Sequence, residues 1–330
     1  MVKVVVPLAL VIFVGVSFFF LDGWPFRRTP KEASSALEAK DQRAKDQPSN
    51  GSEASHRVDD QETARSDDPK KNAKQDAAAP DRKTPVPAEL RRQTENALLA
   101  AKADPDSYRK ALSDAVLDLR LERDFRDELL GDLRKLNEKL IFTAEPTKRY
   151  APWTVQKNDN LTKIAAATNK KNDTNVTPAF LMKVNRLSKP VIMPGQVINV
   201  PIQKMAVRVH KDDFRLFVLL GGVICLDYPV GIGKDDGTPE GEFTIRGKTK
   251  NPNWTTPEGK VLKFGDPGHI IGSRWLGFDN AAGRTTYGIH GTTDESSVGK
   301  SLSAGCVRLK KADLEELFEI VPEGCPVVVK

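Results

Sequence analysis

One long tract of the chain lacks the residues from which a hydrophobic core is built. Residues 31–87 contain no Phe, Trp, Tyr, Ile or Met, and they carry 11 basic and 12 acidic side chains. Such a composition cannot bury enough apolar surface to offset the entropy that a chain loses on folding, so a globular domain is excluded here. We expect a disordered tether, which as a flexible coil would span roughly 40 Å on average. His56 lies in this tether, and we assign it no role.

A cleavage site is also missing after the apolar run near the start of the chain. Residues 4–21 form 18 consecutive uncharged positions, and no small-x-small pattern follows them. A run of that length is about what is needed to cross a bilayer core of roughly 30 Å. The missing site favours an uncleaved anchor over a removed signal peptide, so residues 1–30 are predicted to be a membrane anchor.

The chain has a net charge of +6 but no basic stripe interleaved with aromatic residues. Nucleic acid is therefore not expected as a partner. The positive surplus lies mainly in residues 151–202, which have seven basic and two acidic side chains. A segment of this charge would be drawn to an anionic polymer, although a solvated surface without a partner is the alternative interpretation.

Cysteine and histidine are scarce, with three and four copies, yet one of each lies in the run YGIHGTTDESSVGKSLSAGCVRL. Cys306 follows His290 by 16 positions, and a thiol becomes a useful nucleophile when a nearby imidazole takes its proton. Glycines at 291 and 305 allow close backbone approach, and main-chain N–H groups beside Cys306 could face a developing oxyanion. Arg308 would share the face of Cys306 in an extended segment and could hold a carboxylate. The alternative is that Cys306 is a buried core thiol.

The same run resembles the catalytic domain of the L,D-transpeptidases (the YkuD family), whose signature is a His-Gly pair followed by S-x-G-C-[IV]-R. The matching residues are HG at 290–291 and SAGCVR at 303–308, and the resemblance covers most of residues 203–330. It implies that Cys306 is the nucleophile, that His290 is its base, and that the carbonyl of Gly291 orients the imidazole. It also implies acylation by carbapenem-type β-lactams and no metal or organic cofactor. Ala304 stands where some members carry a second histidine. This departure bears on the fine detail of which substrate is bound and not on whether the domain is active.

The substrate site is expected to involve residues on both sides of this signature. Aromatic residues here could line a groove, although aromatics in such positions are more often part of the core. The residues predicted to bind substrate are Arg308, Ser303, Gly305, Tyr287 and Trp275.

Residues 151–202 form a second recognisable unit, with strands expected near 153–155 and 197–200 and helices beginning after Asn160 and at Thr177-Pro178. The motifs WTVQKNDNLTKIA, KVNRL and IMPGQVINVP resemble a LysM module, a compact βααβ fold that binds N-acetylated glycans such as peptidoglycan. The resemblance implies a glycan-binding site. Its expected residues are Asn158, Asp159, Asn160, Leu161 and Asn185.

Residues 88–150 have a helical pattern, with one apolar stripe from Tyr108 to Leu119 and another from Phe125 to Leu140. Two or three amphipathic helices are predicted, with breaks at Asp104-Pro105 and Gly131. A small bundle, a partner-binding module and a coiled coil that forms a homodimer all remain open.

Residues 203–330 are predicted to be a mainly-β, sandwich-like domain with one short helix at 311–320 and a hairpin at Gly221-Gly222. Cys225 and Cys325 either bridge in an oxidising compartment or stay as buried thiols.

The chain is therefore expected to be a multidomain enzyme of the cell envelope, anchored in the membrane by residues 4–21, with its catalytic domain facing the periplasm or wall side. The expected order is an anchor (1–30), a disordered linker (31–87), a helical segment (88–150), a LysM module (151–202) and a catalytic domain (203–330). By resemblance, its function is L,D-transpeptidation that forms 3→3 peptidoglycan cross-links. A hydrolytic L,D-carboxypeptidase and a catalytically idle membrane-to-wall anchor are the alternatives. The acyl acceptor stays open between a second stem peptide, a lipoprotein and a free D-amino acid.

Overall fold

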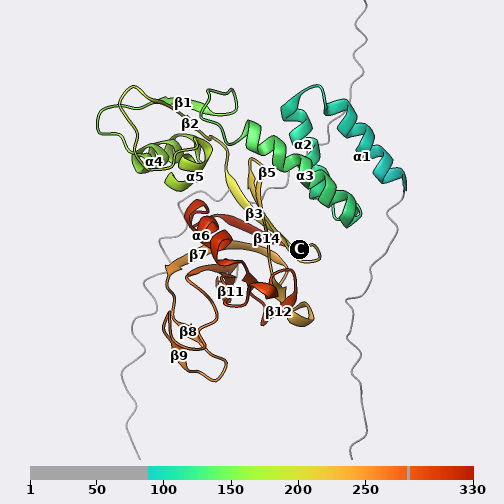
Figure 1. The fold of residues 1–330 in the computed structure, drawn as a ribbon, viewed down its shortest axis with the longest axis vertical. Helices are drawn as coiled ribbons and strands as arrows, with labels where there is room; N and C mark the ends of the chain where they lie inside the picture. Colours follow the sequence, from blue (N-terminus) through green and yellow to red (C-terminus); the bar gives the residue numbers. More distant parts are fainter. Residues whose placement is uncertain (1–87, 281–282) are drawn as a thin grey trace, which may run out of the picture. The chain divides into compact units, whose positions relative to one another are not determined.

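The computed structural model describes residues 88–280 and 283–330 (Figure 1). The described residues all belong to one compact unit. The predicted anchor and tether lie outside the described residues. Within the described part of the chain, none of the helices is long and apolar enough to cross a membrane.

Three helices make up the first part of the described chain: α1 (Ala88–Ala101), α2 (Pro105–Val116) and α3 (Arg123–Leu140). The predicted break at Asp104-Pro105 is confirmed. The Asp104 carboxylate accepts a hydrogen bond from Ser107 N at 2.9 Å, and Pro105 occupies the first helical turn, where its missing N–H costs nothing. The predicted break at Gly131 is wrong, because this residue lies within α3, where no neighbour crowds it.

Residues 151–200 contain β1 (Ala151–Thr154), α4 (Leu161–Asn172), α5 (Pro178–Val184) and β2 (Val197–Val200), and the two strands pair antiparallel. Asn160 caps α4 by accepting from Lys163 N at 2.9 Å, and Thr177 caps α5 by accepting from Phe180 N at 3.1 Å. The βααβ order predicted from the sequence is confirmed.

The rest of the chain is built on one eight-stranded mixed sheet with the strand order β13-β11-β10-β7-β14-β3-β4-β5. Its strands are β3 (Met205–His210), β4 (Arg215–Leu220), β5 (Val223–Pro229), β7 (Gly241–Lys250), β10 (Arg274–Asn280), β11 (Gly283–His290), β13 (Val307–Arg308) and β14 (Pro326–Val329). Two small sheets join β6 (Ile232–Gly233) to β12 (Ser301–Ser303) and β8 (Trp254–Thr255) to β9 (Val261–Leu262). The predicted hairpin is present, with Gly221 and Gly222 at φ of 61° and 83°.

The mainly-β prediction is confirmed, but the sandwich is wrong, because the long strands hydrogen-bond into one sheet and do not form two packed sheets. Leu216 of β4 and Ile289 of β11, from opposite parts of the sheet, share one buried cluster with Leu314 of α6 (Lys311–Ile320). The sheet therefore curls, and α6 fills its inner side (Figure 1).

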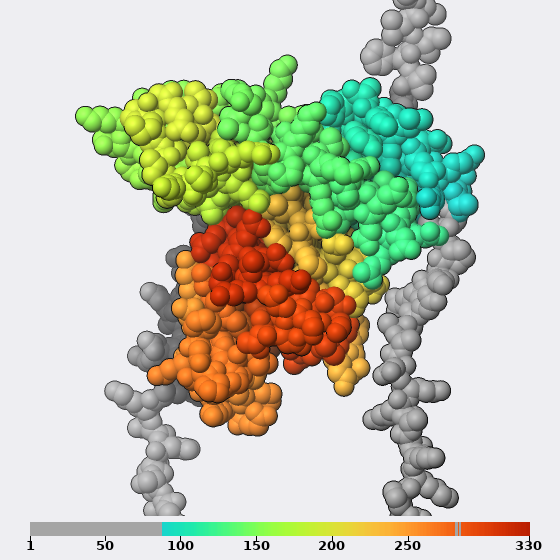
Figure 2. Space-filling model, viewed as in Figure 1, coloured from blue at the N-terminus to red at the C-terminus, as the bar shows by residue number. Residues whose placement is uncertain are grey.

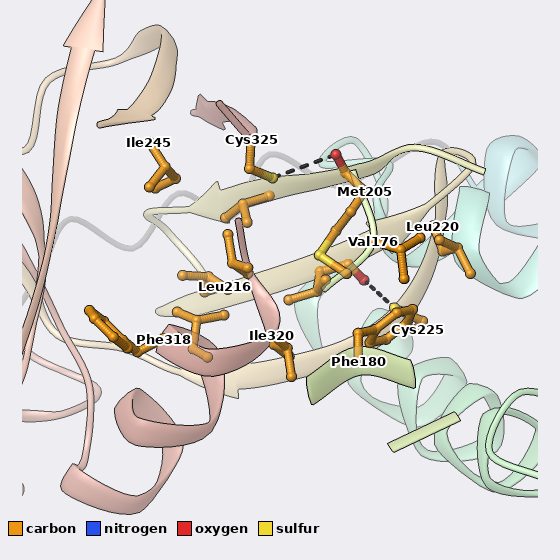
Figure 3. Close-up of a cluster of buried hydrophobic side chains, with 14 of the residues drawn as sticks. Val176, Phe180, Met205, Leu216, Leu220, Cys225, Ile245, Phe318, Ile320 and Cys325 are labelled. Atoms are coloured by element: carbon orange, nitrogen blue, oxygen red, sulfur yellow. Dashed lines mark hydrogen bonds between the residues drawn. The ribbon is translucent and has the colours of Figure 1, made fainter. Parts of the chain in front are cut away.

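Cys225 and Cys325 are free thiols in this core (Figure 3). Each donates to a backbone carbonyl, Cys225 to Val218 O at 3.3 Å and Cys325 to Met205 O at 3.5 Å. Burial raises the pKa of each thiol to about 12. Of the two alternatives, the buried thiols are observed and the bridge is not.

The helical segment packs on the edge strand β5, and Figure 2 shows its blue-green atoms against the yellow atoms of this region. Ser113 Oγ accepts a hydrogen bond from Ile224 N at 2.9 Å, and Asn137 Nδ2 donates to Ile224 O at 3.1 Å. These side chains satisfy backbone groups that an edge strand otherwise leaves open. Of the open interpretations, a small bundle is observed; a homodimer through this segment stays a prediction.

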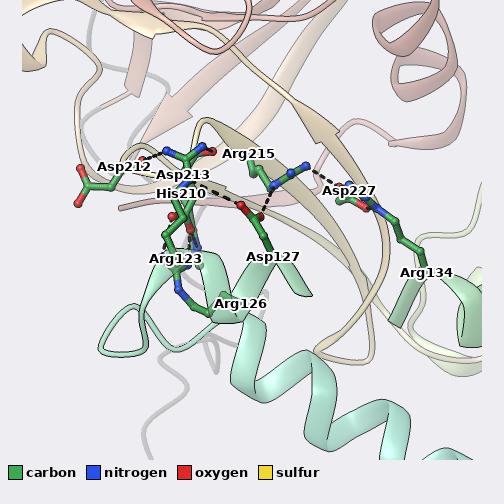
Figure 4. A network of polar contacts seen from close by, with 9 residues as sticks. All are labelled: Arg123, Arg126, Asp127, Arg134, His210, Asp212, Asp213, Arg215 and Asp227. Atoms are coloured by element: carbon green, nitrogen blue, oxygen red, sulfur yellow. Dashed lines mark hydrogen bonds and ion pairs between the residues drawn. The ribbon is translucent and has the colours of Figure 1, made fainter. Parts of the chain in front are cut away.

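Ion pairs reinforce the same junction (Figure 4). Arg126 forms a buried, two-pronged ion pair with Asp213. Arg134, whose side chain is exposed, forms a two-pronged ion pair with Asp227 at 2.6 and 2.8 Å. The Asp213 carboxylate also accepts from His210, whose ring is buried. Burial alone would raise the pKa of Asp213, but His210 and Arg126 hold it down at about 2.

Candidate active site

Parallel pairing of β11 with β13 brings together the two residues predicted to carry the chemistry. Ile289 pairs with Val307 and His290 with Arg308. Cys306 directly precedes β13, so it lies beside the end of β11. Its Sγ donates to Thr286 O at 3.9 Å. The pairing of β11 with β13 thus brings Cys306 close to His290, although the two are 16 positions apart in the sequence.

His290 is buried, and its ring is oriented by a short hydrogen bond. Nδ1 donates to the carbonyl oxygen of Gly291 at 2.6 Å, so Nε2 carries the lone pair. Burial lowers the pKa of His290 to about 4; the Gly291 carbonyl opposes this shift, and the charges of Arg308 and His269 add to it. The imidazole is therefore neutral near pH 7 and can accept a proton at Nε2.

Cys306 is half-buried, and this burial raises the pKa of its thiol above the ordinary value. The backbone N–H of Gly288 and the charge of Arg308 act in the opposite direction without reversing the shift. At rest the site therefore holds a neutral thiol and a neutral imidazole on neighbouring strands. A neutral thiol needs a base to take its proton before it can act as a nucleophile, and a neutral imidazole is chemically able to do so.

The loop that carries Cys306 is held in shape by Ser303. The buried Ser303 hydroxyl donates to Cys306 O at 2.6 Å and accepts from Gly305 N at 3.1 Å. Gly305 has φ of 132°, and a Cβ there would lie 2.5 Å from Cε1 of Tyr287 and 2.7 Å from Gly237 O, so a larger residue would displace the loop. Ser303, Gly305 and Tyr287 thus shape the loop, and their direct contact with substrate stays a prediction.

Arg308 is the charged residue of the site. Its backbone pairs with Gly231, with both N···O distances at 2.8 Å, which fixes the start of its side chain. Within residues 88–280 and 283–330, no carboxylate pairs with its guanidinium, which is half-buried. An uncommitted guanidinium next to the thiol suits a substrate carboxylate.

Trp275 lies across from His290 in the β10–β11 pair. The two rings stack with centroids 5.9 Å apart and an interplanar angle of 18°. That Trp275 lines a substrate groove stays a prediction. In the structure its ring contacts the candidate base, His290.

The predicted glycan-binding residues divide into two groups. Asn158 and Asn160 are exposed at the turn before α4, where Asn158 has φ of 71°, and Asp159 accepts from Trp153 Nε1 at 3.0 Å. Leu161 and Asn185 are each only 3% exposed, and the Asn185 amide is bonded to Leu181 O and to the backbone of Asn199. We correct the prediction for these two, because a buried side chain offers a glycan no surface.

Two residues outside the predicted site set lie around the reacting pair. Gly288 directs its N–H at Cys306, and His269, buried with Nε2 2.9 Å from Pro252 O, lies close enough to affect the charge of His290. The spacing G-x-H at 288–290 could have indicated the first, because positions two apart share one face of a strand. For His269, in the segment DPGHIIGSRWLG, the sequence left a loop filler and a part of the cleft wall equally open.

Comparisons with known proteins found two matching domain families in this chain. The L,D-transpeptidase catalytic domain (YkuD) matches residues 204–329, and the LysM domain matches residues 153–201. The Bacillus subtilis (strain 168) protein YqjB, which carries an L,D-transpeptidase name, is 41% identical over 124 residues, covering 37% of this chain and 68% of YqjB. YkuD of the same organism, similarly named, is 30% identical over 184 residues, covering 54% of this chain and 97% of YkuD. Both resemblances found in the sequence are confirmed.

Among solved structures, an L,D-transpeptidase from Mycobacterium smegmatis is 20% identical, with a TM-score of 0.32. The similarity covers 41% of this chain and 62% of that structure, which is less than two thirds of its length.

Proposed function

The chain belongs to the L,D-transpeptidase (YkuD) family, and we propose that it forms 3→3 cross-links in peptidoglycan through a thioester on Cys306. The observation that supports the proposal is the β11–β13 pairing, which brings the strand position of Cys306 close to that of His290, whose Nδ1 is bonded to Gly291 O.

In the first half-reaction, Cys306 Sγ attacks the amide carbonyl between the third residue of a tetrapeptide stem, a diamino acid, and the terminal D-alanine. His290 Nε2 takes the thiol proton as the C–S bond forms. The C–N bond then breaks, and the same proton passes to the amine of the departing D-alanine. The product is a thioester on Cys306.

In the second half-reaction, the side-chain amine of another stem attacks the thioester. His290 takes a proton from the attacking nitrogen, the C–S bond breaks, and the sulfur recovers the proton. The new amide joins two third-position residues, which defines a 3→3 cross-link. Atoms and charge balance without a cofactor.

Two further groups assist this chemistry in the proposal. Arg308 has no carboxylate partner among the described residues, so it holds a carboxylate of the stem. The N–H of Gly305 is already bonded to Ser303, so the oxyanion is stabilised by other main-chain N–H groups of the 304–306 turn.

The LysM module holds the enzyme on glycan strands in the same proposal. The exposed turn at Asn158 and Asn160 supplies part of the contact, and the basic surplus of residues 151–202 favours an anionic wall. The protein acts in the cell envelope, anchored through residues 4–21, with the catalytic domain on the periplasmic or wall side. The 57 residues at 31–87 form a tether that lets the catalytic domain reach the wall from the membrane.

Product analysis tests the function. The purified full chain is incubated with disaccharide tetrapeptides, beside Cys306→Ala and the matched variant Cys225→Ala, and muropeptides are identified by mass spectrometry. We expect a dimer that lacks one D-alanine from the full chain and from Cys225→Ala, and none from Cys306→Ala. Tripeptide without dimer would replace the proposal with hydrolysis, and unchanged substrate would favour the idle anchor.

A further inference from the structure

Two glycines lie directly opposite each other beside the candidate base. Gly277 of β10 pairs with Gly288 of β11, two positions along the strands from the pair formed by Trp275 and His290. Positions two apart on a strand share a face, and directly paired residues share it too, so all four occupy one face of the sheet. Two of these four positions are glycines and therefore have no side chain.

The indole of Trp275 occupies this bare area. A Cβ on Gly277 would lie 3.0 Å from Trp275 Nε1, and a Cβ on Gly288 would lie 2.9 and 3.0 Å from Cζ2 and Cη2. Each Cβ would lie closer still to a backbone oxygen, 2.6 Å from Arg246 O for Gly277 and 2.5 Å from Leu276 O for Gly288. Neither glycine has a positive φ. Both are therefore needed for space and not for backbone conformation.

From this position the indole covers the imidazole of His290 in an offset stack. We infer that Trp275 is a positioning residue for His290, and that the Gly277–Gly288 pair provides the space for its indole. The hydrogen bond to Gly291 O fixes one atom of the imidazole, whereas the stack fixes its plane. Together they leave Nε2 with one direction in which to accept a proton. The inference deepens the proposed function, on which its catalytic consequence rests.

The stacked indole also keeps water from one face of the imidazole. Burial is the main cause that lowers the pKa of His290 to about 4. Removing the indole should let this value rise toward the ordinary 6.5. The neutral fraction at pH 5 would then fall from about 0.9 to as little as about 0.03, up to about 30-fold, with little change at pH 8.

A histidine titration by NMR in the full chain tests this without any substrate, with the His290 signal assigned from its loss in His290→Gln. We expect the pKa of His290 to rise in Trp275→Leu and in Gly288→Ala, which keeps the indole but displaces it. Trp275→Phe, which retains an aromatic ring, should restore most of the shift. Trp254→Leu removes a half-buried tryptophan elsewhere in the domain and should change nothing. Should Trp275→Leu fail to fold, Trp275→Phe and Gly288→Ala carry the comparison.

Acylation by the carbapenem ertapenem supplies the second readout. We expect the rate in Trp275→Leu, relative to the unmodified chain, to fall much further at pH 5 than at pH 8. An unchanged pKa of His290 in both Trp275→Leu and Gly288→Ala, an equal loss at both pH values, or an equal pKa rise in Trp254→Leu would overturn the inference. Because the titration needs no turnover, failure of the acyl-transfer proposal would appear separately, as cross-linking that survives in Cys306→Ala.

Discussion

Alkylation of Cys306 by iodoacetamide should rise steeply between pH 6 and pH 8. The thiolate is the reactive form, so the rate follows the ionised fraction. A thiol of pKa about 8.5 is about 0.3% ionised at pH 6 and about 24% at pH 8, a ratio of about 75. Burial raises the pKa of Cys306 above its ordinary value, so its ratio should approach about 100.

The opposite arrangement, a preformed thiolate beside a protonated imidazole, would give a different profile. The thiolate would then be present at pH 6, and the rate would change by less than about twofold over this range. The low pKa of His290, about 4, excludes a protonated imidazole at pH 6 in the present account. A flat profile would therefore refute the assignment of His290 as a neutral general base.

The assay is mass spectrometry of the full chain after timed exposure to iodoacetamide. Cys306→Ser should take up no label, because Cys225 and Cys325 are buried thiols with pKa values of about 12. His290→Gln should keep the steep profile, since the thiolate does not depend on an ion pair, while losing acylation by ertapenem. Loss of alkylation at low pH in His290→Gln would again indicate a preformed pair.

Three other predictions concern the site and its support. Ser303→Ala breaks two hydrogen bonds in the loop of Cys306, so acylation by ertapenem should slow about 10-fold in stopped-flow measurements. An unchanged rate would show that the loop keeps its shape without these hydrogen bonds. Arg126→Ala leaves the buried carboxylate of Asp213 without its arginine partner, so the free energy of unfolding, measured by urea denaturation, should fall by about 3–5 kcal/mol. Adding Asp213→Asn should recover part of this loss. A loss below about 1 kcal/mol in Arg126→Ala would contradict the buried pair. The folded pKa of His290 lies below the unfolded value of about 6.5, so only the unfolded chain binds this proton between pH 6.5 and pH 4, and stability should fall by about 2 kcal/mol from pH 7.5 to pH 5. His290→Gln should lack that share of the loss, and equal urea midpoints for both proteins at pH 5 and pH 7.5 would contradict the low pKa.

Local signals in the sequence predicted those parts of the fold that depend on neighbouring residues. The cap at Asp104, the helix opened by Thr177 and the hairpin at Gly221-Gly222 follow from backbone hydrogen bonding and conformation within a few positions. The helix at 311–320 has the predicted bounds, because its apolar face alternates with charged residues at helical spacing.

Long-range contacts were not predictable in the same way. The docking of α2 and α3 on β5 depends on Ser113 and Asn137 meeting the backbone of Ile224, which lies 111 and 87 positions away. Strand order in the curled sheet depends on such pairings as well, so the sequence alone suggested two sheets. Leu119 followed the apolar stripe but lies beyond the end of α2 and is 41% exposed.

The candidate site was predictable as a set of residue types but not as an arrangement. Cys306, His290 and Arg308 were found from their spacing and from the family signature. The stack of Trp275 on His290 requires the β10–β11 register, which pairs positions 275 and 290 and sets Gly277 opposite Gly288. No local pattern gives that register.

The most direct test of the central claim is the capture of the acyl-enzyme. The full chain is mixed with a disaccharide tetrapeptide in the absence of an acceptor, quenched in acid and digested, and the peptide that carries Cys306 is weighed. We predict that this peptide gains the mass of the disaccharide tripeptide acyl group, with one D-alanine released for each adduct and no adduct in Cys306→Ser. Release of D-alanine that persists in Cys306→Ser, with no adduct on Cys306 in the unmodified chain, would contradict the account.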